Sequence, residues 1–171
     1  FHIQPFSATV PSDGPHKFSA FTASVLQLRP ESTGEINLKT NSWRDAPAIH
    51  PNYLATALDQ STLVKGIQVA RKIAEFEPLK SYIVEEFSPG REISVNDEIG
   101  ILEWARNTSV TIYHPTGTCK MGSDKMAVVD ERLRVHGVRG LRVADCSIMP
   151  KITSGNTNAP AIMIGEKVSE M

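Results

Sequence analysis

The sequence predicts a mixed fold, α+β with a final α/β segment, in which an antiparallel sheet with packed helices precedes a short strand and a last helix. Three observations support this expectation. Apolar and β-branched residues dominate a stretch near the N-terminus, within 20–40. Apolar residues recur at helical spacing in the middle of the chain, between 59 and 107. A strand-like stretch that ends on an acidic residue precedes a further helical stretch between 139 and 168.

The first elements should be strands. Residues 1–20 hold several prolines and a glycine, and should be an irregular connection. Residues 20–28 and 36–38 have strand composition and are separated by Pro30 and Gly34, so we expect a hairpin or a neighbouring pair in one antiparallel sheet. Residues 43–53 contain two further prolines and should form a loop.

Two helices should follow. Apolar residues at 63, 67, 70 and 74 predict a helix from Asp59 to about Phe76, which Pro78 would end. The stretch 94–97 resembles a capping box with Asp in place of Glu, and predicts a helix over about 95–107. Near the end of the chain, 139–145 should be a short strand, and 161–168 should be a helix opened by Pro160.

Composition excludes several classes of protein. The 171 residues are 40% hydrophobic and 22% charged, with a net charge of −1, which provides no basic surface for nucleic acid. The uncharged run 152–165 is too short and too polar to span a bilayer. Cys119 and Cys146 fit no metal or redox spacing, so we expect free thiols, no metal and a cytoplasmic location.

Three linked strings carry the most specific information: HPTGTCKMG at 114–122, VVDERLRVHGVRGLRVAD at 128–145 and GNTNAP at 155–160. Together they resemble the C-terminal signature of the glucose-methanol-choline (GMC) oxidoreductases, flavoenzymes that oxidise alcohols, and most closely the choline-dehydrogenase-like branch. The stretch 47–54 resembles the substrate domain of the same family less distinctively. Other patterns fail: 117–122 has phosphate-loop spacing but lacks the Lys and Ser/Thr that should follow.

The resemblance implies a catalytic pair. Hydride transfer from an alcohol requires the hydroxyl proton to leave, and a base near neutral pKa lowers that barrier. By resemblance His114 is this base, and Asn158 fills a second catalytic position that is His in many relatives. An amide there can hydrogen-bond the substrate oxygen but cannot exchange a proton. The remaining histidines (His2, His16, His50 and His136) have only the general chemistry of the residue to recommend them.

The resemblance also implies an FAD site formed by Asp145, Cys146, Asn158, Ala159 and Pro160. A helix that begins near Pro160 presents unpaired N–H groups, which stabilise negative charge on a reduced flavin. Because proline has no N–H, any donor to the flavin must be Ala159, Ala161 or the Asn158 side chain.

The dinucleotide fingerprint Gly-x-Gly-x-x-Gly is missing from the sequence. We therefore expect residues 1–112 to be part of a substrate-binding domain. Residues 113–171 should be the return segment of a Rossmann-like FAD domain, supplying its last strand and helix. Its partners would be a small alcohol substrate and the missing N-terminal FAD-binding part, without which the fragment should be inactive and expose apolar surface.

Two other readings stay open: a non-catalytic binding remnant of the same fold, and a hydroxynitrile lyase that uses the flavin only structurally. The intact 114–119 string and Asn158 resemble the oxidising branch more closely. The identity of the primary or secondary alcohol, and the choice between dehydrogenase and oxidase, stay open as well.

Overall fold

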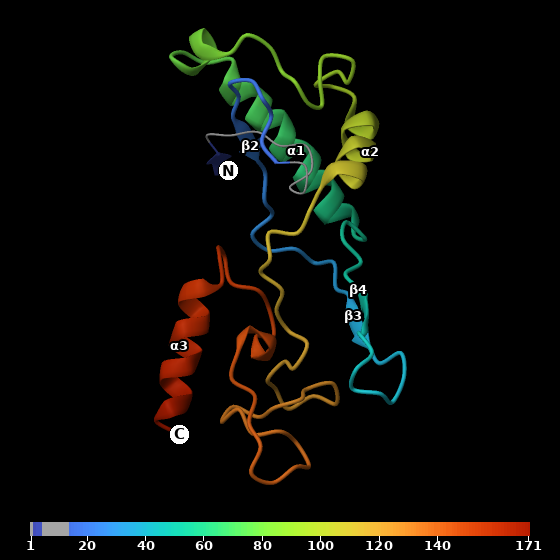
Figure 1. Ribbon diagram of the computed structural model, residues 1–171, viewed down its shortest axis with the longest axis vertical. Helices are drawn as coiled ribbons and strands as arrows, with labels where there is room; N and C mark the ends of the chain where they lie inside the picture. Colours follow the sequence, from blue (N-terminus) through green and yellow to red (C-terminus); the bar gives the residue numbers. More distant parts are fainter. Residues whose placement is uncertain (1, 5–13) are drawn as a thin grey trace. The chain divides into compact units, whose positions relative to one another are not determined.

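The structure, a computed structural model, describes the backbone of residues 2–4 and the whole of residues 14–171. Among the described elements four short antiparallel strands come first, and the helices follow (Figure 1). The elements are β1 (His2–Gln4), β2 (Thr22–Ser24), β3 (Glu35–Asn37), β4 (Ala48–His50), α1 (Ala57–Ala74), η2 (Leu79–Tyr82), α2 (Glu98–Thr108), η3 (Cys146–Ile148) and α3 (Asn158–Ser169).

The chain forms two compact units. Unit 1 is the described part of Phe1–Gln27 together with Leu54–Val110, and unit 2 is Leu28–Tyr53 together with Thr111–Met171. Each unit is therefore built from two separate stretches of sequence. The expected division into a substrate part (1–112) and a cofactor part (113–171) concerns function, and it stays a prediction.

Unit 1 is organised around α1 and α2, which pack against each other (Figure 1). Their shared core consists of Val64, Ile67, Ile101 and Ala105. Ile101 and Ala105 are fully buried, so α2 directs one face into α1. Gly66 permits close approach of the segment after β2, because a Cβ atom there would collide with Cγ1 of Val25.

Both helices of unit 1 begin at a side-chain cap. Thr56 Oγ1 accepts a hydrogen bond from the Asp59 N–H at 3.2 Å, and Asp97 Oδ1 accepts one from the Gly100 N–H at 2.9 Å. The expected helices are confirmed, but the second begins later than predicted. Ser94 instead accepts a bond from the N–H of Asn96, which forms a local turn and leaves the capping role to Asp97.

A single arginine fixes the loop that connects α1 to α2. Arg71 donates two hydrogen bonds to the Glu86 carboxylate, at 2.7 and 2.8 Å. It also donates to the carbonyl oxygens of Ile93 and Gly90, at 3.0 and 3.1 Å. The Arg71 side chain is only 13% exposed, so these four bonds lie largely out of water. One side chain of α1 thus holds three residues of the loop, Glu86, Gly90 and Ile93.

The predicted strand pairing is wrong. The stretch 20–28 contains β2 and the stretch 36–38 overlaps β3, but these strands lie in different two-stranded antiparallel sheets. β2 pairs with β1, and β3 pairs with β4. Both partners fall in segments expected to be irregular, because strand pairing is set by long-range contacts that local composition does not encode.

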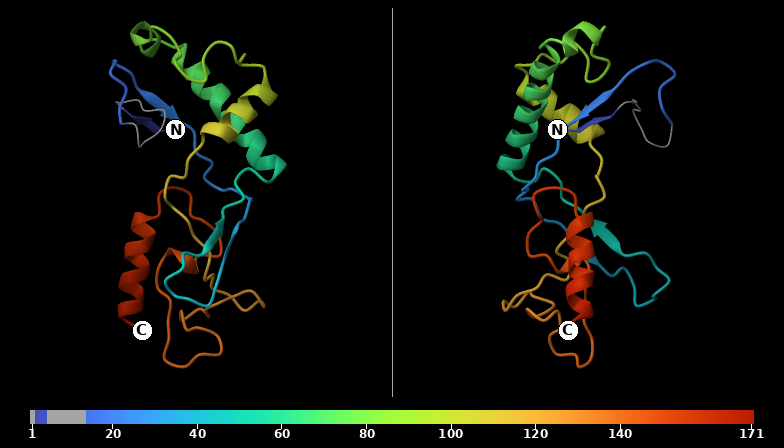
Figure 2. Two further views of the ribbon diagram at one scale, coloured as in Figure 1. Left: turned by 45° about the vertical axis from the view of Figure 1, so that its right-hand side comes forward. Right: turned by 90° about the vertical axis from the view of Figure 1, so that its left-hand side faces the viewer.

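In unit 2, β3 and β4 form a hairpin in which Ile36 lies opposite Ile49 (Figure 1). The backbone approaches itself closely at Gly34, where a Cβ atom would collide with the His50 carbonyl oxygen. The rest of unit 2 surrounds a second core of Val129, Leu133, Ile148, Met149 and Ile164. This core holds the loops between 114 and 149 against α3, the C-terminal helix drawn in red in Figure 2, which contacts η3.

The predicted strand at 139–145 does not form. Its backbone makes only an isolated bridge, between Arg134 and Arg142, and Val143 donates a hydrogen bond to the Leu133 carbonyl. The segment therefore folds back on the turn that precedes it, and Gly140 (φ +74°) interrupts extended backbone. α3 is confirmed but starts two residues before Pro160, at Asn158. Among the described helices, none is long and apolar enough to cross a bilayer.

Candidate active site around His114 and the start of α3

His114 lies on a loop that is bonded along its length to η3. The N–H groups of Gly117, Cys119 and Met121 donate to the carbonyl oxygens of residues 146, 147 and 148, at 3.4, 2.9 and 2.8 Å. Tyr113, directly before His114, has a left-handed backbone (φ +63°) that turns the chain into this loop. The core residues Ile148 and Met149 then connect the loop and η3 to α3.

One hydrogen bond joins the half-buried His114 to the start of α3. Nδ1 of His114 lies 3.0 Å from Oγ1 of Thr157. Thr157 is 6% exposed and is the N-cap residue of α3, although its side chain makes no capping bond. The next residue is Asn158, so the two residues expected to be catalytic come from segments that this bond connects.

The N-terminus of α3 retains free donors. The first N–H groups of a helix have no partner within it, and the described residues offer none to the N–H of Asn158 or Ala159. Pro160 has no N–H. The expectation that Ala161 could donate to a flavin is wrong, because its N–H is bonded to the Thr157 carbonyl at 2.9 Å. The available donors are therefore the N–H groups of Asn158 and Ala159 and the exposed Asn158 side chain.

Asp145 and its neighbours form a second polar group. Asp145 is exposed and caps η3, with Oδ1 accepting from the Ser147 N–H at 2.8 Å. Cys146 is half-buried, and its thiol donates to the Thr157 carbonyl over 3.8 Å. The Ser147 hydroxyl is buried and has no hydrogen-bond partner among the described residues. A buried polar atom without a partner costs free energy, so it points to a group that the chain itself does not supply.

The structure brings His114, Thr157 and Cys146 together through these bonds, but no hydrogen bond joins the side chains of His114 and Asn158, or His114 and Asp145. A shared cavity for His114 and Asn158 stays a prediction. Exposure of Asn158 and Ala159 leaves both free to contact a bound group.

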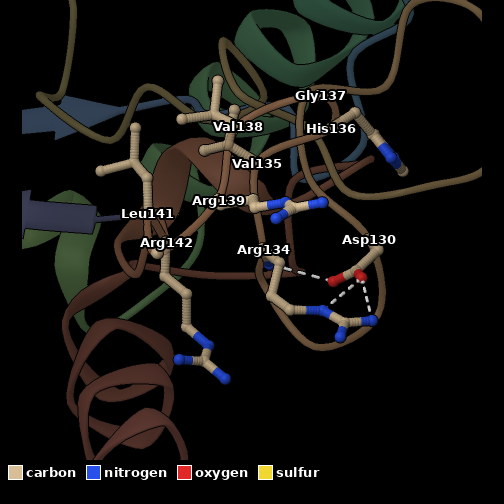
Figure 3. A pocket seen from close by; sticks show the side chains of 10 residues that line it. Asp130, Arg134, Val135, His136, Gly137, Val138, Arg139, Leu141 and Arg142 are labelled. Carbon is tan, nitrogen blue, oxygen red and sulfur yellow. Dashed lines mark hydrogen bonds and ion pairs between the residues drawn. The ribbon is translucent and has the colours of Figure 1, made fainter.

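A cavity of about 440 Å³ lies elsewhere in unit 2, along the loop 130–142, and includes none of the expected site residues (Figure 3). Asp130, Arg134, His136 and Arg142 in its lining already have structural partners. Arg134 pairs with Asp130 at 2.7 Å, and Arg142 extends away from this pair to donate to the Arg132 carbonyl. The Arg134 side chain, with backbone N–H groups of Arg134 and Arg132, lowers the pKa of the Asp130 carboxyl to about 2. We therefore interpret the cavity along 130–142 as the surface of a turn that the Asp130–Arg134 pair stabilises.

Cys119 and Cys146 are both free and half-buried. Within the part of the chain that the structure describes, no group of three or more His, Cys, Asp and Glu side chains is placed to hold a metal ion. The candidate site consists of His114, Thr157, the first residues of α3 and the Asp145–Ser147 turn.

Two of these residues were not predicted from the sequence. Thr157 was missed because threonine before a helix is usually a cap. A signal was present in the sequence. An N-cap side chain commonly accepts from the N–H of the third helical residue, and in α3 that residue is Pro160, which has no N–H. Ser147 was missed because an unpaired hydroxyl can be recognised only from its surroundings.

Comparison with known proteins places these features in a family context. The sequence model of the family described as GMC oxidoreductase matches residues 30–165. The chain is 40% identical over 170 residues to an oxygen-dependent choline dehydrogenase of Pseudomonas fluorescens SBW25, covering 99% of this chain and 30% of that protein. It is 42% identical over 151 residues to an alcohol dehydrogenase (acceptor) of Pseudomonas putida, covering 88% of this chain and 27% of that protein.

Solved structures agree with the sequence matches. Pyridoxine 4-oxidase from Mesorbium loti superposes with a TM-score of 0.78 at 31% identity, over 84% of this chain and 28% of that one. A formate oxidase variant from Aspergillus oryzae RIB40, studied for its FAD modification, gives a TM-score of 0.77 at 29% identity, over 84% of this chain and 25% of that one. The chain thus spans about 30% of the length of the curated relatives reported above.

Proposed function

This chain belongs to the GMC oxidoreductase family, and from that premise we propose that it is the C-terminal part of an enzyme that oxidises an alcohol by hydride transfer to FAD. The observation that carries the proposal is the hydrogen bond between His114 and Thr157. It links the expected base to the helix end that carries Asn158, inside the segment that the family matches.

The residues present fit FAD. The free N–H groups of Asn158 and Ala159 suit an acceptor that gains negative charge. The unpaired Ser147 hydroxyl, beside Asp145 and Cys146, suits a polar chain or diphosphate. We propose that these two neighbouring groups, with Pro160 shaping the start of α3, hold adjoining parts of the cofactor, since the Cys146 thiol is bonded to the Thr157 carbonyl. FAD, when bound, supplies an acceptor for a hydride.

We propose the following roles for the residues of this chain. His114 takes the hydroxyl proton on Nε2, because its Nδ1 is bonded to Thr157. The Asn158 side chain donates a hydrogen bond to the same substrate oxygen and keeps it close to Nε2. With the proton held by His114, FAD at this site would accept the hydride from carbon, and the alcohol would leave as the carbonyl product.

The substrate should be a small alcohol. The relatives include a choline dehydrogenase and an alcohol dehydrogenase, so choline and unbranched primary alcohols are the first compounds to test. Neither is favoured by a contact in this chain, and the remaining part of the protein should contribute to the choice.

The test uses the complete protein as it is encoded. Mass spectrometry of the released small molecule should identify FAD, and the yellow colour should bleach when a substrate alcohol is added without oxygen. A nicotinamide cofactor, or no cofactor, would overturn the proposal. Bound FAD that never bleaches with any alcohol would favour a non-catalytic remnant, and cleavage of a cyanohydrin without bleaching would identify a lyase.

A further inference from the structure

The three α-helices that the structure describes begin in two different ways. Thr56 and Asp97 cap α1 and α2 by accepting from the N–H of the third helical residue, Asp59 and Gly100. Thr157 occupies the same N-cap position in α3, yet its hydroxyl caps nothing. The third helical residue of α3 is Pro160, which has no N–H to offer. The hydroxyl is therefore available for another partner, and that partner is His114.

The main chain of Thr157 is held by two hydrogen bonds to its carbonyl oxygen. Its carbonyl oxygen accepts from the Ala161 N–H at 2.9 Å and from the Cys146 thiol over 3.8 Å. The residue is 6% exposed, and a β-branched side chain has few rotamers. Oγ1 is thus a fixed point, built by α3 and η3, against which the half-buried His114 ring is placed.

From this arrangement we propose that Thr157 is a positioning residue that selects the working nitrogen of His114. The inference rests on the proposed function, in which His114 is the base. A base at Nε2 must have its lone pair there, so Nδ1 must carry the hydrogen and donate it to Oγ1 of Thr157. After proton uptake at Nε2, Nδ1 still carries its hydrogen, and the same bond persists. The hydroxyl therefore holds the ring in one orientation before and after the proton moves.

The alternative role for Thr157 is purely structural, as a buried residue that supports the start of α3. The two roles differ in what they predict. A positioning residue acts only through His114, so its removal should matter little once His114 is gone. A structural residue should affect FAD content and thermal stability, whether or not His114 is present.

The experiment is a double-mutant cycle in the complete flavoprotein, with Thr157→Val, His114→Ala and the double variant. Stopped-flow flavin reduction at saturating alcohol gives the rate, and its dependence on alcohol concentration gives the affinity. Thr157→Val removes the hydroxyl at nearly constant volume and should lower the rate roughly 10- to 100-fold, since small misplacements of a catalytic group have effects of this size. Alcohol affinity and FAD content should stay near those of the wild type.

Two comparisons complete the design. Thr157→Ser keeps a hydroxyl and should restore most of the rate, whereas Thr153→Val, at an exposed threonine in the same unit, should change nothing. If Thr157→Val does not fold, Thr157→Ala removes the same hydroxyl without placing a methyl group against the ring. Failure of Thr157→Ala to fold as well, with Thr157→Ser intact, would assign the hydroxyl a structural role and overturn the inference.

The outcomes separate this inference from the proposed function. If His114→Ala reduces flavin at the wild-type rate, His114 is not the base, and both fail. If His114→Ala is slow but Thr157→Val is not, only the positioning role of Thr157 is overturned. The same conclusion follows if Thr157→Val lowers the rate of His114→Ala by the same factor as that of the wild type.

Discussion

His114 Nδ1 and Thr157 Oγ1 lie 3.0 Å apart although the two residues are separated by 43 positions in the sequence. The segments that it joins are also linked through η3 and the core around Ile148. α3, alone among the three described α-helices, begins without a side-chain cap, because Pro160 at its third position has no N–H to offer. The N-terminus of α3 is consequently open to a ligand.

Replacement of His114 tests the proposed base. His114→Ala should lower the rate of flavin reduction roughly 10²- to 10⁴-fold, the usual effect of a positioned acid or base. Stopped-flow spectroscopy of the complete protein measures it, with FAD content confirmed for each variant. His136→Ala is the matched control, because this exposed ring only bonds the Gly122 carbonyl. Wild-type rates in His114→Ala would place the base elsewhere.

Asn158 should contribute less than His114. Asn158→Ala removes a neutral hydrogen bond to the substrate oxygen and should slow flavin reduction by about 2- to 13-fold, equivalent to about 0.5–1.5 kcal/mol. Asn158→His should retain activity, because an imidazole N–H can donate a hydrogen bond to the same substrate oxygen. A larger loss in Asn158→Ala than in His114→Ala, measured in the same assay, would reverse the assigned roles.

Ser147 should contact the cofactor. Its buried hydroxyl has no partner among the described residues, so Ser147→Ala should not destabilise the protein without FAD. The same variant should weaken FAD binding by about 2- to 13-fold, the effect of one lost neutral hydrogen bond. Titration of FAD into the cofactor-free protein measures the affinity, and thermal unfolding measures stability. Unchanged FAD affinity together with a lowered melting temperature would contradict this assignment.

Asp130 should make stability depend on pH in acid. Its pKa in the folded state is about 2, lowered chiefly by the Arg134 side chain from an ordinary value of 3.8. Between these pH values the unfolded chain binds more protons than the folded one, so the contribution of Asp130 is complete above about pH 4 and is lost as the pH falls toward 2. Denaturant unfolding at several pH values should show the wild type losing its advantage over Asp130→Asn across this window. A constant difference would contradict the prediction.

Arg71 should be important for the stability of unit 1. Arg71→Met keeps the apolar stem but leaves the Glu86 carboxylate and two carbonyl oxygens without their donor. We expect a loss of about 2 kcal/mol, between the values for exposed and fully buried ion pairs. Lys120→Met is the matched control, since its pair with Asp124 is more exposed and should contribute little to stability. Equal losses in denaturant unfolding would rule out a special role for Arg71.

Local signals predicted the helices well. The apolar spacing around Leu63 and Ile67 identified α1, and the stretch 94–97, which resembles a capping box, identified α2. Both signals lie within a few turns of the helix that they predict. The strands were predicted poorly. β2 and β3 have suitable composition, but their partners, β1 and β4, lie in proline-rich sequence without a strand pattern. Three-residue strands depend on contacts made elsewhere in each unit.

The site was predicted in part. The motif strings identified His114, Asn158 and the Asp145 turn as segments of interest, and residues 30–165 match the same family. The bond between His114 and Thr157 required three-dimensional information, because it joins two loops through a residue that has an ordinary capping role elsewhere. The assignment of Ala161 as a donor failed for a related reason. Its N–H lies one position inside the helix, where the Thr157 carbonyl accepts it.

The division of the chain into interleaved stretches determines the order in which its parts can fold during synthesis. All residues of unit 1 have been made once Val110 is in place. Unit 2 has received only the hairpin segment Leu28–Tyr53 at that point, and must wait for Thr111–Met171. Because domains fold as units while the ribosome adds residues at about 5–20 per second, the β3–β4 hairpin spends several seconds without the second stretch of its unit. A stop or frameshift after residue 110 would therefore leave the residues of unit 1 attached to a hairpin that lacks the rest of unit 2. We expect proteases to cleave such a product at this hairpin.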